Sequence, residues 1–194
     1  MDITSEELEL LNNSNFIFTK IKAQEKIYSL LQNTRTEINT FFQNSNFLFH
    51  QKLKISEFDK ISKGEKYLNL PYMILDSPAY FSKNNIFDYR TMFLWANFFS
   101  FSLHLQGLFL DYYKHKLLNN FDNLLNKNIY ISVSDSPWEY LYNKNNYVLV
   151  SKEHIDFIKT APFIKLSKKC TLSEWRNVPK FSVDFLEFLL RILS

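Results

Sequence analysis

The sequence predicts an α+β protein in which helices pack mainly on one face of a mixed or largely antiparallel sheet. Residues 98–106 alternate apolar and polar side chains without interruption, which is the pattern of a strand with one buried face. Residues 16–42 and 182–193 carry apolar side chains at helical spacing. At 194 residues with 46% hydrophobic content, the chain can bury a sizeable core, so we expect a single domain.

The N-terminal segment of this domain, residues 4–43, is predicted to be helical. Thr4 and Glu7 have the spacing of a capping box, which indicates a short first helix. A long amphipathic helix follows over residues 16–42, with Gln24 and Arg35 interrupting its apolar series. Because of these two interruptions, we interpret it as a helix that covers the core rather than as a coiled-coil seam.

The body of the domain, residues 47–170, begins with two predicted strands. Residues 47–55 alternate as a strand does, and a polar turn over residues 56–66 follows, with Gly64 as its pivot. Residues 67–76 read as the next strand, in which Pro71 favours an edge position or a break because proline cannot donate to a ladder. Ser77 and Pro78 are predicted to end this strand.

We interpret residues 92–106 as one long central strand, bent or bulged at Ala96 and Asn97. A short helix within residues 82–90 is expected to lead into it. Both faces are apolar in its first part, which predicts burial on both sides there. The second part has a single apolar face.

The remaining elements follow from the same periodicities, and they place a final helix at residues 182–193 with Ser182 as its cap. The others are a helix over residues 108–126, a strand over 129–134, a hairpin of 138–142 and 147–150 around the turn 143–146, a helix over 151–160 and a strand over 163–167.

Two stretches of the body resemble a known group of proteins. Residues 69–81, NLPYMILDSPAYF, and residues 86–107, IFDYRTMFLWANFFSFSLHLQG, look like a family of uncharacterised proteins of similar length from Flavobacterium-like bacteria. The resemblance covers about a fifth of the chain. It implies a bacterial protein, and it brings with it no activity, ligand or functional residue.

Composition excludes several classes of site. With only two glycines, the chain cannot form a P-loop or a dinucleotide-binding fingerprint. The one cysteine, Cys170, allows no internal disulfide and no zinc ribbon, and it fits a reducing compartment. We see no secretory signal and no apolar run long enough to span a bilayer, so we expect a cytoplasmic protein.

The strongest candidate for chemistry is His104, which alternation places on the less apolar face of the central strand. Ser100, Ser102 and Gln106 share this face, and together with Asn97 they are our candidate binding residues. If Asp76 or Asp135 came within hydrogen-bond reach, His104 could act as a general base with an orienting carboxylate. The alternative is a polar sheet face, solvated or helix-covered, that carries no chemistry.

Other candidates have simpler explanations. Asp76 and Asp135 each precede Ser-Pro at a predicted strand end; they could supply paired carboxylates, although turn chemistry explains both motifs. The four histidines show no metal-ligand spacing, so we expect no metal and no cofactor. Cys170 next to two lysines is expected to be inert packing. Basic residues have aromatic neighbours in places, but acids are interspersed and net charge is only +3, so we do not expect nucleic-acid binding.

Two hypotheses about function remain. The first is a non-enzymatic protein that binds a partner protein or a small apolar ligand, which we favour because no catalytic motif is present. The second is a small hydrolase or transferase that uses His104 with Asp76 or Asp135. The helix at residues 182–193 is apolar around most of its circumference, so it must be buried within the chain, in a homodimer or against a membrane surface.

Overall fold

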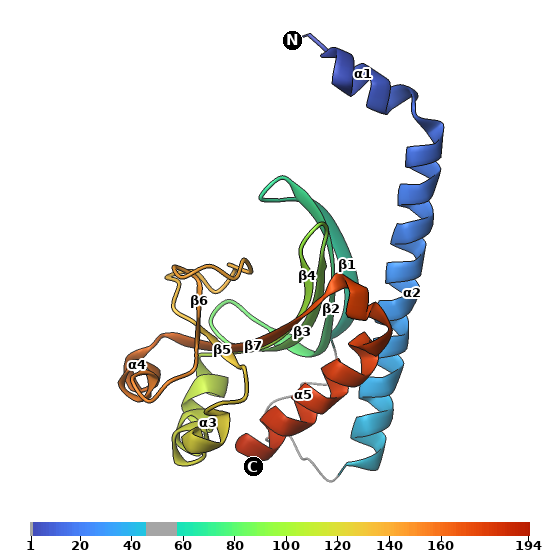
Figure 1. Ribbon diagram of the computed structural model, residues 1–194. Helices are drawn as coiled ribbons and strands as arrows, with labels where there is room; N and C mark the ends of the chain where they lie inside the picture. The colour runs from blue at the N-terminus through green and yellow to red at the C-terminus, as the bar shows by residue number, and fades with distance from the viewer. Residues whose placement is uncertain (1, 46–57) are drawn as a thin grey trace.

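The computed structural model describes residues 2–45 and 58–194, and its centre is a seven-stranded sheet (Figure 1). The order of strands is β1-β2-β3-β4-β7-β5-β6, and every neighbouring pair is antiparallel. The strands are β1 Phe58–Tyr67, β2 Leu70–Phe81, β3 Ile86–Leu94, β4 Phe98–Gln106, β5 Tyr130–Ser132, β6 Tyr147–Leu149 and β7 Phe163–Thr171.

Helices complete the architecture, and the predicted α+β class is confirmed. They are α1 Ser5–Asn12, α2 Ser14–Asn44, α3 Leu108–Asn119, α4 His154–Thr160 and α5 Val178–Ile192, with 3-10 helices at Phe121–Leu124 and Leu172–Asn177. Helices α2 and α5 cross one face of the sheet side by side (Figure 1). The main core lies between these helices, α3 and the sheet.

Both predicted N-terminal helices are present. The backbone N–H of Glu7 donates to Thr4 Oγ1 over 3.2 Å, and the N–H of Thr4 donates to Glu7 Oε2 over 2.8 Å, which closes the capping box at the start of α1. The prediction that the long helix covers the core holds only for its second half. All of its buried side chains lie between Leu30 and Ile38. Helix α1 and the first turns of α2 extend beyond the body (Figure 1).

The strand predicted over residues 47–55 lies outside the described residues, and the turn predicted around Gly64 is wrong. Gly64 lies inside β1, where a Cβ atom would come within 2.4 Å of the ring of Tyr72. The ring of Tyr72 therefore lies directly over this glycine. The chain turns instead at Leu68 and Asn69, which both have positive φ.

Strand β2 runs past both of its prolines. The registers with β1 and β3 shift between Gly64 and Tyr67 and between Asp76 and Ala79, so Pro71 and Pro78 lie at irregularities where a missing N–H is tolerated. The prediction that Ser77 and Pro78 end the strand is therefore wrong. The short helix expected within residues 82–90 is also wrong, because β3 begins at Ile86.

The predicted central strand is a hairpin of two strands. Alternation over residues 98–106 is confirmed in β4, but the chain reverses between Leu94 and Phe98 instead of bending. Ala96 takes φ of 57°, and the N–H of Asn97 donates to the carbonyl of Leu94. No glycine marks this turn, which is why the sequence pattern did not reveal it. Burial on both sides is confirmed, since every residue of β3 is buried.

The C-terminal half follows the predicted order with shifted boundaries. Residues 138–142 form no strand, and β6 pairs with β5, so the predicted hairpin is wrong. Helix α5 begins at Val178, which places Ser182 inside it rather than at its cap. The Ser182 carbonyl accepts from Tyr89 Oη over 2.6 Å, and its hydroxyl lies 2.8 Å from that of Thr91. These bonds tie α5 to β3.

Helix α5 is covered within the chain. Eight of its residues are buried, including Phe185, Leu186 and Leu189, and it packs against α2 and β4. Among the described residues, no exposed large apolar side chain belongs to α5. We predicted a homodimer through this helix because its apolar face needed a partner, and the structure covers that face within the chain.

Candidate functional site

The polar side chains of β4 lie together on the sheet face opposite α2 and α5. Ser100, Ser102 and His104 are buried, and Gln106 is half-buried. They are buried because residues 133–146, which we call the cover segment, lie across this face. The contacts that hold this segment come mainly from side chains of the sheet.

The cover segment is anchored by charged and phenolic groups. Lys165 Nζ donates to the carbonyls of Pro137 and Glu139 over 2.9 and 3.0 Å. Arg90 donates to the hydroxyl of Tyr140. At the other end of the sheet, Tyr67 Oη accepts from the backbone N–H of Tyr140 over 2.8 Å. The segment has no regular secondary structure, so these bonds replace a backbone ladder.

The centre of this face is formed by three charged residues, Asp88, Arg90 and Lys165, which were not among our candidate site residues. Arg90 on β3 makes a bidentate ion pair with Asp76 on β2, at 2.6 Å from Nε to Oδ1 and 3.1 Å from Nη2 to Oδ2. Asp88 lies 3.3 Å from the same Nε. In the sheet register, Asp88 stands opposite His104, and His104 stands opposite Lys165. We call Asp76, Asp88, Arg90, His104 and Lys165 the polar cluster.

Burial shifts the titration of His104, Asp88 and Lys165 toward their neutral forms. Loss of solvent, followed by the positive charges of Lys165 and Arg90, lowers the pKa of His104 to about 3. Burial also raises the pKa of Asp88 well above its ordinary value and lowers that of Lys165 well below its own. His104 is therefore uncharged at neutral pH, and its low basicity makes it a poor general base.

The structure brings some predicted site residues together and separates others. Asp76 and His104 share the polar face, but both carboxylate oxygens of Asp76 accept from Arg90. The ring of His104 packs edge-on against Trp138 and Phe163, with centroids 5.8 and 5.7 Å away.

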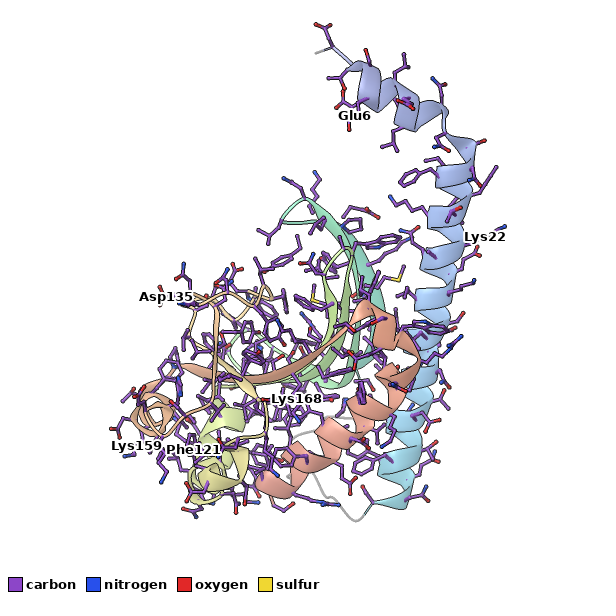
Figure 2. The ribbon with its side chains drawn as sticks, viewed as in Figure 1. Glu6, Lys22, Phe121, Asp135, Lys159 and Lys168 are labelled. Carbon is purple, nitrogen blue, oxygen red and sulfur yellow. The ribbon has the colours of Figure 1, made fainter. Side chains whose placement is uncertain are left out.

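Asp135 and Asn97 lie apart from this cluster. Asp135 is exposed on the outer side of the cover segment (Figure 2). Asn97 lies in the β3–β4 turn and donates to the carbonyl of Trp95. The catalytic pairing of His104 with a carboxylate stays a prediction.

Two buried atoms of the polar cluster, His104 Nε2 and Asp88 Oδ1, make no hydrogen bond in the structure. Neither residue lines any of the four main grooves of residues 2–45 and 58–194. No group of three or more His, Cys, Asp or Glu side chains in these ranges is arranged to hold a metal ion. The bonds from Arg90 and Lys165 to the cover segment favour a structural role for the polar cluster, in which it fixes this segment on the sheet.

One signal in the sequence pointed to this cluster. Asp88 and Arg90 alternate with the apolar residues Phe87 and Tyr89, so period two places both charges on one face of a strand. We assigned this stretch to a helix, and the pattern was lost. Lys165 is likewise a charged residue between apolar neighbours, in a strand that we did predict.

A different surface is formed by residues 2–29, which we call the arm. Nine of the fourteen exposed large apolar side chains of the described residues belong to it. They are Ile3, Leu8, Leu10, Leu11, Phe16, Ile17, Phe18, Ile21 and Tyr28, each between 39% and 65% exposed. Helix α1 buries none of its residues. Figure 2 shows Glu6 on α1, away from the sheet, and Lys22 on the side of α2 that faces away from the body.

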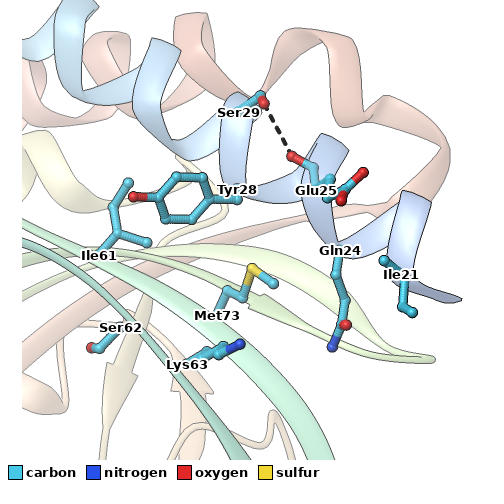
Figure 3. Close-up of a pocket in the computed structure, with 9 residues that line it drawn as sticks. All are labelled: Ile21, Gln24, Glu25, Tyr28, Ser29, Ile61, Ser62, Lys63 and Met73. Carbon is cyan, nitrogen blue, oxygen red and sulfur yellow. Dashed lines mark hydrogen bonds between the residues drawn. The ribbon is translucent and has the colours of Figure 1, made fainter.

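Where the arm meets the body, a groove of about 680 Å³ separates α2 from β1 and β2 (Figure 3). Ile21 and Tyr28 line it from the helix, and Ile61, Lys63 and Met73 line it from the strands. Its volume is within the roughly 300–1,000 Å³ of ligand sites. The groove is apolar at its base and carries a lysine on its strand side.

A smaller groove of about 490 Å³ lies between the end of β7 and α5. Lys168, Cys170, Phe181 and Phe185 are among the residues that line it. Burial raises the pKa of the Cys170 thiol to about 12, so the thiol is protonated at neutral pH. This state agrees with the expected role of Cys170 as inert packing.

Comparison with known proteins places this fold in no group. No family model, no curated protein and no solved structure matches the chain. The resemblance to the Flavobacterium-like family stays a prediction. Within the described ranges, every helix is too short or too polar to cross a bilayer.

Proposed function

We propose that the protein is a non-enzymatic interaction protein that binds a macromolecular partner through its arm. The observation that carries this proposal is the concentration of exposed apolar side chains on residues 2–29, of which none is buried. The concentration supports an interaction site, because large exposed apolar patches mark such sites in soluble proteins. The body, by contrast, covers both faces of its sheet.

The arm has an energetic reason to bind. Leu8, Leu11 and Phe16 are 53%, 65% and 43% exposed. Since full burial of such a side chain is worth roughly 1.5–3 kcal/mol, covering the exposed half of each contributes about 1 kcal/mol. A helix that projects from the body is less stable than a packed one, because most helical stability comes from packing of the apolar face. A partner would supply that packing.

The body serves as a rigid base for the arm. The second half of α2 is fixed by Leu31, Thr34 and Ile38, which are at most 1% exposed. The polar cluster holds the cover segment and lines none of the four main grooves of the described residues. We also propose a bacterial, cytoplasmic protein; the family resemblance and the lone cysteine support this.

Site-specific photocrosslinking tests the proposal. A photoreactive phenylalanine analogue replaces Leu11, and in a matched control it replaces Leu108, which is 60% exposed on the body. In the cell of origin, the Leu11 probe is expected to yield an adduct of one discrete mass that the Leu108 probe does not give. Absence of an adduct at Leu11, or the same adducts from both positions, would contradict an interaction through the arm.

A further inference from the structure

The chemistry of the arm selects its partner. Residues 1–19 contain four acids, Asp2, Glu6, Glu7 and Glu9, and no lysine or arginine. Since the whole chain has a formal net charge of +3, the remaining residues carry +7. The first part of the arm is therefore acidic and leucine-rich, whereas the rest of the molecule is basic.

The groove between α2 and β1 has the complementary chemistry. Its base is apolar, Lys63 lines it from β1, and Glu25 lines it from α2. Outside its lining, Lys22, Lys26, Lys60 and Lys66 are exposed on α2 and β1, where the lysines outnumber the exposed acids Glu25, Asp59 and Glu65. An acidic helix with leucines is the ligand that such a groove fits, because apolar side chains can enter it while carboxylates face the lysines.

The lengths of the two surfaces also match. Helix α1 has eight residues and is about 12 Å long. The helical wall of the groove runs from Ile21 to Ser29, which spans about the same length along α2. In the structure, α1 lies beyond the end of this groove and does not contact it (Figure 1). The α1 of the same chain therefore leaves this groove open.

We infer that the arm binds a second copy of this chain, with α1 of each copy seated in the α2–β1 groove of the other. This inference rests on the proposed function, since it names the partner of the same surface. A two-fold arrangement is self-complementary, so it covers both arms and both grooves at once. Nucleic acid and anionic membranes are poorer partners because the acidic helix repels them.

Disulfide trapping tests the contact directly. In a Cys170→Ser background, one chain carries Leu8→Cys and another carries Ser62→Cys, which replaces a residue lining the groove. Mixed and oxidised, the two chains are expected to form a covalent dimer of twice 23.3 kDa. Leu8→Cys mixed with Lys144→Cys, an exposed position on the cover segment, is the control that stays uncrosslinked. A disulfide that forms only when both cysteines are in one chain overturns the inference, because α1 then folds back on its own groove.

Light scattering of the full chain over a range of concentrations gives a second measure. The wild-type chain is expected to be a dimer, and Leu8→Glu weakens the dimer at least tenfold. Leu149→Glu is the matched control, since both leucines are 53% exposed, and it leaves the dimer unchanged. Lys63→Glu also weakens the dimer, and adding Glu6→Lys and Glu9→Lys to the same chain restores it.

The outcomes separate this inference from the proposed function. A wild-type chain that is monomeric at every concentration overturns the second-copy inference. If the probe at Leu11 then captures a different protein, the proposed function stands. If it captures nothing, both fail.

Discussion

Replacing Arg90 with methionine tests the role of the polar cluster. The side chains of Arg90, Asp76 and Asp88 are 8%, 11% and 3% exposed. Arg90→Met keeps much of the volume and removes the cation that both carboxylates face. Breaking a buried pair in this way costs about 3–5 kcal/mol, because the Asp76 carboxylate loses its partner at a site with little access to water. We expect the free energy of unfolding to fall by that amount.

Urea unfolding followed by circular dichroism at about pH 7 measures this loss, and an unchanged slope shows that the two states compared remain the same. Arg191→Met is the matched control. It breaks a pair with Glu187 whose side chains are 75% and 41% exposed, and such pairs contribute about 0–1 kcal/mol. Adding Asp76→Asn to Arg90→Met is expected to recover part of the lost free energy of unfolding, because it removes a buried carboxylate that no longer has a partner. An Arg90→Met variant as stable as Arg191→Met would refute the reasoning.

Three further predictions concern packing, titration and the attachment of α5. Gly64→Ala should lower stability by at most about 1 kcal/mol in thermal unfolding, because the new Cβ atom comes within 2.4 Å of the Tyr72 ring, whose outer end can shift; a larger loss would show that the ring cannot move aside. Since the pKa of His104 is about 3 in the folded state and 6.5 ordinarily, the unfolded state binds the additional proton between these values, and stability falls as pH drops below about 6.5. His104→Gln should remove this contribution, which reaches about 1.4 kcal/mol per pH unit, so parallel pH profiles of the two proteins would count against it. Tyr89→Phe should cost about 1 kcal/mol in urea unfolding, because its hydroxyl donates to the buried carbonyl of Ser182; no loss would show that this bond does not hold α5.

The sequence predicted those parts of the fold in which one periodicity acts without interruption. The alternation of residues 98–106 identified β4 and the face that His104 occupies, since a strand has only two faces. The turn at Ala96 was missed because alanine rarely takes positive φ, and no glycine or Asn-Gly pair marks the reversal. The turn assigned to Gly64 was wrong for the opposite reason, because this glycine makes room for a ring.

The two candidate surfaces were predictable to different degrees. The apolar positions of the helix at residues 16–42 were correct, but periodicity does not show where the body ends beneath a helix. Ile17 and Leu31 are equivalent members of the apolar series, yet in the structure Ile17 is 39% exposed and Leu31 is fully buried. The polar cluster depends on pairing between strands, such as that of Asp88 with His104, which the alternation of a single strand does not reveal.

Amide hydrogen exchange of residues 5–28 tests the central claim, that the arm is a binding surface, most directly. Helix α1 has no buried residue when no partner is bound. Its amides are then expected to exchange as fast as those of an isolated helix, which opens readily. The account predicts slow exchange of α1 in the wild-type chain at high protein concentration and fast exchange in Leu8→Glu at the same concentration. Equally fast exchange in both proteins, at every concentration and in the cell extract, would contradict it.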